Sequence, residues 1–425
     1  MTVQDQPSTS KNFHGAYDKL IYVVSDASFV TNAKYRFIAQ VYVDGAFQAK
    51  LKVLPNNSNL GVFDVSRIVQ DYLEVDNDVH GTTDYTSSTD AANQVKVAFG
   101  REFATTAEDE PSETLAVTTT NLITVVAGQF VPWYSETYDG TTADNYVYDS
   151  GTALNPFLTA YKGKTIYVTE NDQGVVALPT ITTMGATSLG IGLRFKNSSG
   201  SVIADGAYTS AVISISGAGG NAPTGEGVYY IPAYPYNLEN NTISITGGSL
   251  QPSDYTGWAS YEIFNINDSS NDTCILKFER KDACKYGHTR IAWWNTYGGW
   301  DYLNCYGSTR ESVSYERFNY RTYGDNAFDV STVVGYEVTP SGRIVTGGQS
   351  KVKRNLRLHT GFLPSDYNDV INDFMQSPKV LVYWQGVWQP VRTNTSSLQY
   401  KDNVIDKTID YEFEVEFGVH ENAIG

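Results

Sequence analysis

The segment KYRFIAQVYVDGAFQAKLKVL, residues 34–54, decides how the N-terminal part of the chain folds. Apolar and aromatic side chains recur at every second position of its first half: Tyr35, Phe37, Ala39, Val41 and Val43. This period of two is typical of a strand with one buried face. Asp44-Gly45 is a tight-turn signal, and Phe47–Leu54 follows it as a second strand. The segment therefore predicts a hairpin in a largely one-faced sheet.

Further strands are expected on both sides of this hairpin, at Lys19–Val24, Gln94–Phe103 and Leu115–Val126. The segment FDVSRIVQDYLE, residues 63–74, departs from the strand pattern. Its apolar side chains fall at helical spacing: Val65, Ile68, Val69 and Tyr72. We expect a short helix there, inside an immunoglobulin-like or fibronectin-like β-sandwich that spans residues 13–127. Residues 1–12 are polar and are expected to form a flexible arm.

The middle of the chain divides into two parts by composition. Residues 128–163 are rich in tyrosine and glycine and are interpreted as a connecting arm, which carries Trp133 and Tyr134. Residues 164–270 contain strand-like segments separated by turn signals, among them VYYIPAY, residues 228–234, and AVISISG, residues 211–217. They predict a middle β-sandwich.

Residues 271–425 are expected to form a C-terminal β domain. Its strands include TRIAWW, residues 289–294, and WDYLNCY, residues 300–306, with a turn or bulge at Gly298-Gly299. A hairpin is expected to turn at Gln385-Gly386. Helical spacing of apolar residues predicts a short helix near residues 365–376. The fold class is thus mainly β, with several immunoglobulin-like or β-sandwich domains and two short helices.

The charge of the chain limits the classes of partner that it can bind. The formal net charge is -17, from 30 basic and 47 acidic residues, so phosphate backbones are repelled and nucleic acid is not expected as a partner. No stretch reaches the roughly 20 apolar residues that a membrane-spanning helix needs, so no membrane insertion is expected. The first residues, MTVQDQPSTSKNF, lack the pattern of a secretory signal. We expect that the chain leaves its place of synthesis, if at all, without a cleaved leader.

Three acidic residues near the C-terminus are the best candidates for catalysis. Glu412, Glu414 and Glu416 alternate with aromatic and apolar residues, so their carboxylates share one face of a strand. Their spacing is compatible with the roughly 5–9.5 Å between the two carboxylates of a glycosidase. Ordinary strand alternation explains them better, as a solvated or partner-facing surface. With no other catalytic motif in the sequence, we do not expect an enzyme.

The sequence gives little support for a metal site. Cys284 and His288, with Cys274 and Cys305 in the same region, could supply zinc ligands, but no C-x2-C pair occurs. Free, buried cysteines are the better interpretation. Asp76, Asp78 and His80-Gly81 resemble the start of a calcium loop, but Ser87 stands where a bidentate glutamate belongs. We expect neither a metal nor another cofactor.

The densest aromatic segment is WWNTYGGWDYLNC, residues 293–305. Trp293 and Trp294 must face opposite sides of a strand, so one is expected in a core and the other at a surface, a second sheet or another chain. Two interpretations stay open: an assembly hot spot or sugar-stacking platform, or aromatic packing of a β corner within the chain. The interface candidates are Trp293, Trp294, Tyr297, Trp300, Tyr302, Trp133, Tyr134, Trp384 and Trp388.

Three segments carry a resemblance to bacteriophage tail and virion proteins. They are CKYGHTRIAWWNTYGGWDYLNC, the early KYRFIAQVYVDGAFQAKLKVLP with GVFDVSRIVQDYL, and the late SPKVLVYWQGVWQPVRTNTSSLQYKDN with TIDYEFEVEF. The resemblance implies a non-enzymatic structural subunit of the virion, at the tail tip, baseplate or fibre-attachment ring. It also implies a symmetric homo-oligomer that is made in the host cytoplasm, contacts other virion proteins and supports host attachment. The alternative is a carbohydrate-binding adhesin or receptor-binding protein that contacts a host surface glycan, suggested by the aromatic residues of the tyrosine-rich loops.

Overall fold

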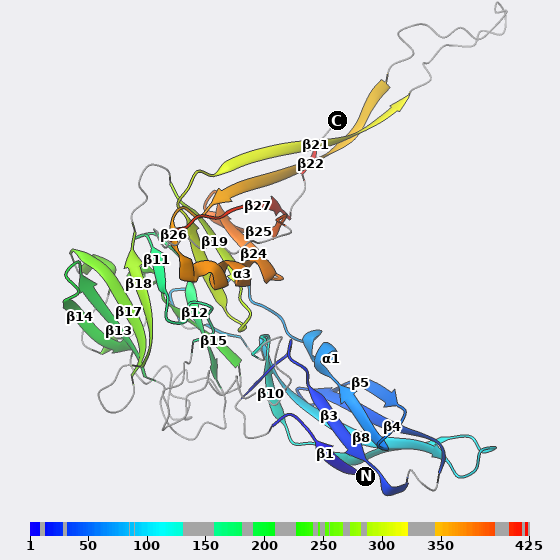
Figure 1. Cartoon of the computed structure of the whole chain (residues 1–425). Helices are drawn as coiled ribbons and strands as arrows, with labels where there is room; N and C mark the ends of the chain where they lie inside the picture. Colours follow the sequence, from blue (N-terminus) through cyan, green and yellow to red (C-terminus); the bar gives the residue numbers. More distant parts are fainter. Residues whose placement is uncertain are drawn as a thin grey trace, which may run out of the picture. The chain divides into compact units, whose positions relative to one another are not determined.

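The computed structural model describes residues 1–8, 13–28, 32–84, 86–88, 90–130, 157–180, 190–208, 227–240, 245–246, 251–254, 256–266, 273–281, 287–321, 345–395, 408–418 and 421–423. These residues form a mainly β protein with several sheets and three short α-helices (Figure 1). The fold class expected from the sequence is therefore confirmed. Among the described residues, no helix is long and apolar enough to cross a bilayer.

The chain divides into two compact units. Unit 1 contains Met1–Asp282, Trp293–Leu303 and Asp366–Pro378, and unit 2 contains Ala283–Ala292, Asn304–Ser365 and Lys379–Gly425. The sequence grouped Trp293–Leu303 and Asp366–Pro378 with the C-terminal domain, whereas both segments cluster with unit 1. The limits of separate sandwiches within unit 1 stay a prediction.

Two sheets form the N-terminal part of unit 1. The smaller has the order β1-β3-β6, and the larger has the order β2-β10-β8-β4-β5, with β9 beside β8. The strands of the smaller sheet are β1 (Thr2–Asp5), β3 (Ile21–Ser25) and β6 (Leu60–Asp64). Those of the larger are β2 (His14–Gly15), β4 (Ala33–Val43), β5 (Ala46–Val53), β8 (Ala92–Ala104), β9 (Ser112–Thr119) and β10 (Ile123–Val126).

The predicted hairpin is confirmed in its register and its turn. β4 and β5 are antiparallel, with Val43 opposite Ala46. Asp44 and Gly45 both have positive φ, 49° and 79°, as a two-residue turn of a twisted hairpin requires.

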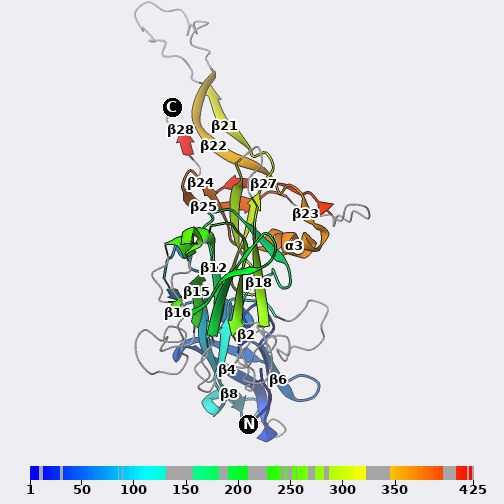
Figure 2. The same cartoon turned by 90° about the vertical axis from the view of Figure 1, so that its left-hand side faces the viewer.

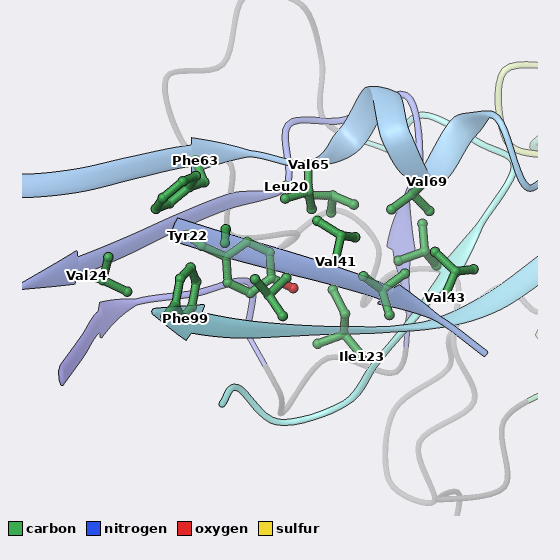
Figure 3. Close-up of a cluster of buried hydrophobic side chains, with 14 of the residues drawn as sticks. Leu20, Tyr22, Val24, Val41, Val43, Phe63, Val65, Val69, Phe99 and Ile123 are labelled. Atoms are coloured by element: carbon green, nitrogen blue, oxygen red, sulfur yellow. The ribbon is translucent and has the colours of Figure 1, made fainter. Parts of the chain in front are cut away.

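Figure 3 shows the buried cluster between these two sheets, to which β3, β4, β6, β8, β10 and the helix α1 (Ser66–Gln70) contribute. The helix adds Val69, and Val65 stands immediately before it. At its start, the Asp64 carboxylate accepts a hydrogen bond from the Ser66 N–H at 3.0 Å. The helix predicted from the FDVSRIVQDYLE pattern is therefore present, and it closes one side of the core.

The middle part of unit 1 contains a sheet of order β11-β18-β17-β13-β14-β16 and a sheet of order β12-β15-β7. Their strands are β11 (Thr165–Val168), β13 (Gly190–Asn197), β14 (Val202–Tyr208), β16 (Ile245–Thr246), β17 (Trp258–Ile266), β18 (Thr273–Arg280), β12 (Val175–Thr180), β15 (Gly227–Pro232) and β7 (Thr86–Ser88). The 3-10 helix η3 spans Pro252–Asp254. The predicted strand at residues 211–217 lies outside the described residues.

A third helix, α2 (Pro235–Glu239), was not expected from the sequence. It begins with Pro235 at its first position, where the missing N–H costs nothing. The strand expected over residues 228–234 consequently ends at Pro232.

Unit 2 is built on a sheet of order β20-β19-β24-β25-β27-β22-β21, with β28 also beside β22. Its strands are β19 (Thr289–Trp294), β20 (Trp300–Cys305), β21 (Arg310–Arg321), β22 (Val345–His359), β24 (Val380–Trp384), β25 (Val387–Thr393), β27 (Glu412–Phe417) and β28 (Glu421–Ala423). The chain passes between the two units within β19 and within β20. A short pair, β23 (Leu363–Pro364) and β26 (Thr408–Ile409), completes the strands.

Two predicted local features of the C-terminal third are confirmed. The hairpin between β24 and β25 turns at Gln385 and Gly386, whose φ angles are 52° and 85°. The helix expected near residues 365–376 is present as the 3-10 turn η5 (Ser365–Tyr367) followed by α3 (Asn368–Gln376), which belongs to unit 1.

Candidate functional site

The aromatic segment Trp293–Leu303 lies inside unit 1. Trp293 is 0% exposed and Trp294 is 2% exposed, so neither ring lies at a surface of this chain, which was one of the three positions expected for the second ring. Elements pack on both sides of the strand: the Trp293 ring contacts Phe374 of α3, with centroids 5.7 Å apart, and the Trp294 ring contacts Trp300 at 5.5 Å. This burial favours the interpretation that these residues pack a corner within the chain.

Each indole N–H of this segment has an acceptor from a distant part of unit 1. Trp293 Nε1 donates to Asp373 Oδ2 at 2.7 Å. Trp294 Nε1 donates to the Ala127 carbonyl at 3.0 Å. Trp300 Nε1 donates to the Asp76 carbonyl at 2.8 Å. Because buried indoles need such partners, the three tryptophans fix segments far apart in the sequence to one hairpin.

Tyr302 forms a hydrogen bond with His80, which belongs to residues 76–81, the segment that resembles the start of a calcium loop. Its hydroxyl lies 2.8 Å from Nδ1 of the buried His80 and accepts a hydrogen bond from the Val175 N–H at 3.2 Å. The fifth aromatic residue, Tyr297, is half-buried, and burial raises the pKa of its hydroxyl. Residues 76–80 therefore support the hairpin.

Asn295 organises the turn between β19 and β20. Its Oδ1 accepts hydrogen bonds from the N–H groups of Tyr297 and Gly299 at 2.9 and 3.0 Å. Its Nδ2 donates to the Leu158 carbonyl and to Asp301 Oδ2, both at 2.9 Å. An amide side chain offers two donors and one oxygen with two lone pairs, so all four positions are used. The turn is thereby tied to residue 158, far away in sequence.

Asp301 is a buried carboxylate with three donors. Thr159 Oγ1 donates to one oxygen at 2.5 Å, and the Ala160 N–H and Asn295 Nδ2 donate to the other at 2.7 and 2.9 Å. Burial raises the pKa of Asp301 to about 7, although these hydrogen bonds act in the opposite direction. Its charge therefore changes near neutral pH.

Asp373 holds the other side of the hairpin. Besides Trp293, its carboxylate accepts hydrogen bonds from the N–H and hydroxyl of Thr296. Burial raises its pKa above the usual range. Asp301 and Asp373 thus both bind protein donors, and sequence reasoning missed them because their partners are remote. One signal was present: Asp373 lies beside the apolar stripe of a predicted helix.

A small cavity of about 220 Å³ lies beside the hairpin within unit 1. Its side chains are neutral, and several carry amides or hydroxyls: Tyr17, Gln129, Trp294, Asn295, Thr296, Gln376, Ser377 and Pro378. Tyr17 is 48% exposed, whereas Trp294 and Asn295 are buried. An exposed aromatic ring beside neutral polar groups is suited to a small uncharged, hydroxyl-rich ligand.

The three candidate carboxylates of β27 all bind neighbouring strands within unit 2. Glu412 pairs with Arg357, Glu414 accepts a hydrogen bond from Asn355 at 2.7 Å, and Glu416 accepts one from Arg392 at 3.0 Å. Burial acts to raise the pKa of Glu416, but the hydrogen bonds from Arg392 and Asn394 outweigh it, so the pKa is lowered. Glu412 and Glu414 fit the interpretation of β27 as an ordinary sheet surface, whereas Glu416 is buried.

The cysteine and histidine candidates are not brought together in the described part of the chain. Cys305 is a buried free thiol of unit 2, and burial raises its pKa. His288 packs beside the ring of Tyr306, 5.9 Å between centroids. Cys284 lies outside the described residues, as does the side chain of Cys274. Among the described residues, no group of three histidine, cysteine or acidic side chains could hold a metal ion.

The remaining interface candidates are in different places. Trp384 and Trp388 lie on the β24–β25 hairpin of unit 2 and are half-buried. Their rings contact Phe417 at 6.4 Å and Tyr383 at 5.3 Å. Trp133 and Tyr134 lie outside the described residues.

One strand with many exposed side chains, β21, was missed by sequence reasoning. β21 pairs with β22 over Arg310–Arg321 and ends the sheet of unit 2, and both views show these two strands as a long ribbon (Figures 1 and 2). Residues 310–316 are all exposed, including Val313 at 37% and Tyr315 at 58%. The signal in the sequence was the alternation of Glu311, Val313 and Tyr315 with serines.

No protein-family model matches the chain, and no curated protein matches it.

Proposed function

We propose that the chain is a non-enzymatic structural subunit of a bacteriophage virion, placed in the tail at the tip, the baseplate or the fibre-attachment ring. It assembles as a symmetric oligomer with other virion proteins and supports attachment to the host. The resemblance of its sequence to phage tail and virion proteins motivates the identity. The observation that carries an assembly role is the open, exposed edge of β21.

An unpaired strand edge is a site of strand addition. β21 spans 12 residues, and its outer backbone N–H and C=O groups face no other described strand. Monomeric proteins usually keep such edges short or cover them, because they pair with other chains. Strand addition uses these same main-chain groups for affinity and the alternating side chains for specificity. A long open edge is therefore useful to a protein that functions inside an assembly.

The buried hairpin of unit 1 supports the same role. Its tryptophans, Asn295 and the two carboxylates bind at least four separate segments of the chain through hydrogen bonds. Fully satisfied buried polar networks make a core rigid and specify one arrangement. A rigid unit 1 is suited to a fixed position in a particle.

Particle composition tests this proposal. Phage particles from the source of the sequence would be purified by density gradient, and their proteins would be identified by mass spectrometry. We expect the chain to copurify with tails at a constant stoichiometry, and antibody-labelled electron microscopy to place it on the tail. Its absence from purified particles would refute the proposal.

A carbohydrate-binding adhesin is the second candidate, and the cavity beside Tyr17 favours it. The exposed Tyr17 ring offers a stacking face, and Gln129, Thr296 and Gln376 line the same cavity. Trp300 is 1% exposed and offers no stacking face. A glycan array would compare the parent with Tyr17→Ala, using Tyr72→Ala as the control because Tyr72 is also exposed, at 40%. Binding lost only in Tyr17→Ala supports the adhesin, and an array without signal for the parent refutes it.

A further inference from the structure

We propose that β21 is the strand through which two copies of this chain join, each β21 pairing antiparallel with the other about a two-fold axis at Ser314. The proposal rests on the proposed structural function, which requires contacts between subunits, and it commits to a second copy of this chain as the occupant of the edge. Four observations on unit 2 lead to it.

The first observation is the edge itself. β21 pairs with β22 from Arg310 opposite Arg357 to Arg321 opposite Val345, and it ends the sheet in the described part of the chain. One side of its backbone is therefore paired and the other is open. A second antiparallel strand at the usual spacing of about 4.8 Å would satisfy the open groups.

The second observation is that one apolar face of the sheet is buried at β22 but exposed at β21. Residues directly opposite each other in an antiparallel pair share a face of the sheet. Tyr315 lies opposite Val352, which is only 6% exposed, yet Tyr315 itself is 58% exposed. Val313 shares this face, opposite Arg354. The buried face of β22 thus continues onto β21 as an exposed face, where an added strand would supply lateral neighbours to Val313 and Tyr315.

The third observation is that β21 is complementary to itself about Ser314. This register places Val313 opposite Tyr315 of the second copy, which gives an aromatic pair with a β-branched residue on each side of the axis. It also places Glu311 opposite Arg317 of the second copy, twice in the dimer. In this register the sequence therefore sets an acidic residue opposite a basic one at both ends of the contact.

The fourth observation is that neighbouring registers are less favourable. An axis at Glu316 sets two glutamates against each other. An axis between two residues pairs side chains that belong to opposite faces, because the side-chain period of a strand is two. An axis at Val313 sets Glu311 opposite Tyr315 and replaces the two Val313–Tyr315 pairs with a single Val313–Val313 pair. An axis at Tyr315 keeps a single Tyr315–Tyr315 pair but sets Val313 opposite Arg317.

Cross-linking tests the axis. In the proposed register the two Ser314 Cα atoms are about 4.5–5.5 Å apart, within the range of a disulfide. The full chain carrying Ser314→Cys should form a disulfide-linked dimer under mild oxidation. Ser312→Cys is the matched control, because its two copies would be about 13 Å apart. The parent chain, with its own three cysteines, corrects for background.

Charge exchange tests the register. Glu311→Arg sets arginine against Arg317 of the second copy, so sedimentation equilibrium should show dimerisation at least about tenfold weaker. The double variant Glu311→Arg with Arg317→Glu should restore it. Glu316→Arg is the control: Glu316 forms an ion pair with Lys353, as Glu311 does with Arg354, but it faces Ser312 in the proposed dimer. This control should dimerise like the parent.

The outcomes separate this inference from the proposed function. Two results overturn β21 pairing: Ser314→Cys dimers that form no disulfide cross-link, and a dimer affinity that does not change on charge exchange. Neither result contradicts an assembly role through another surface. A parent chain that stays monomeric at high concentration also overturns β21 pairing. A β21 dimer of a chain that is absent from purified particles supports the pairing and refutes the virion function.

Discussion

Asn295 shows how much a single side chain contributes to the buried hairpin. Removing its amide leaves two N–H groups and two acceptors inside unit 1 without this partner, and each unsatisfied buried group costs about 1–3 kcal/mol. We predict that Asn295→Ala lowers the free energy of unfolding of unit 1 by about 3–5 kcal/mol. Urea denaturation followed by the fluorescence of the buried tryptophans measures this change.

Asn197 provides the matched control. Its side chain also accepts several hydrogen bonds in a turn, from the N–H and hydroxyl of Ser199 and the N–H of Ser201, but these bonds are exposed. Water replaces the lost partner there, so Asn197→Ala should cost about 1 kcal/mol or less. Equal losses in the two variants would contradict the assigned role of burial.

The raised pKa of Asp301 predicts that the stability of unit 1 depends on pH. This pKa is about 7 in the folded protein and near 3.8 in an unfolded chain. Between about pH 4 and 7 the folded state therefore keeps a proton that the unfolded state releases, so this group's contribution to stability falls as pH rises through that window. Above about pH 7 both states are ionised and the dependence ends.

The variant Asp301→Asn should remove this dependence. Relative to the parent, its free energy of unfolding should gain about 1.4 kcal/mol per pH unit as pH rises across the window. Denaturant titrations at several pH values measure the slope. Asp26→Asn is the control, because the pKa of Asp26 is lowered to about 2 and its folded and unfolded forms are both ionised in the window. Parallel profiles for Asp301→Asn and the parent would refute the assignment.

At the scale of elements, the turn between β19 and β20 allows no side chain at Gly299. A Cβ there would lie 2.3 Å from the Leu158 carbonyl oxygen and 2.9 Å from the Ala177 Cβ. We predict that Gly299→Ala lowers the stability of unit 1 by about 2–4 kcal/mol, because backbone has to move. Thermal unfolding should show a midpoint several degrees lower.

Gly81→Ala is the control for Gly299→Ala. The nearest atom to a Cβ at position 81 is Gln173 Oε1 at 3.8 Å, an ordinary contact. A midpoint within about one degree of the parent is expected for a change of a few tenths of a kcal/mol. A stable Gly299→Ala protein would show that the turn can shift away from residue 158.

Elements with strong local signals were predictable from the sequence. The β4–β5 hairpin follows from alternation and Asp44-Gly45, and α1 and α3 follow from helical spacing. The short α2 was not, because the continuous apolar run VYYIPAY, residues 228–234, leads into it without helical spacing. The burial of both Trp293 and Trp294 could not be predicted from the sequence either, since their partners Asp373 and Ala127 lie 80 and 167 residues away. Alternation predicts that two faces exist and says nothing of what covers each one.

At the scale of the whole molecule, the acidic charge opposes the proposed pairing of two copies. Each chain carries a formal charge of -17, so two copies repel each other at low ionic strength. We predict that raising sodium chloride from about 20 to about 300 mM strengthens self-association, because the Debye length falls from about 20 to about 6 Å. Sedimentation velocity measures the change, with glycerol at equal osmolality as the control. Weaker association in salt would show that local ion pairs dominate over the total charge.

The reactivity of the buried Cys305 thiol reports how often unit 2 opens. The thiol is enclosed and its raised pKa keeps it in the unreactive protonated form, so an alkylating reagent can react only when unit 2 opens. In a background with Cys274→Ser and Cys284→Ser, the labelling rate then reports how often unit 2 opens without any denaturant. The same measurement on the β21 dimer proposed above would show whether its formation slows the opening of unit 2, and it needs no label other than the reagent.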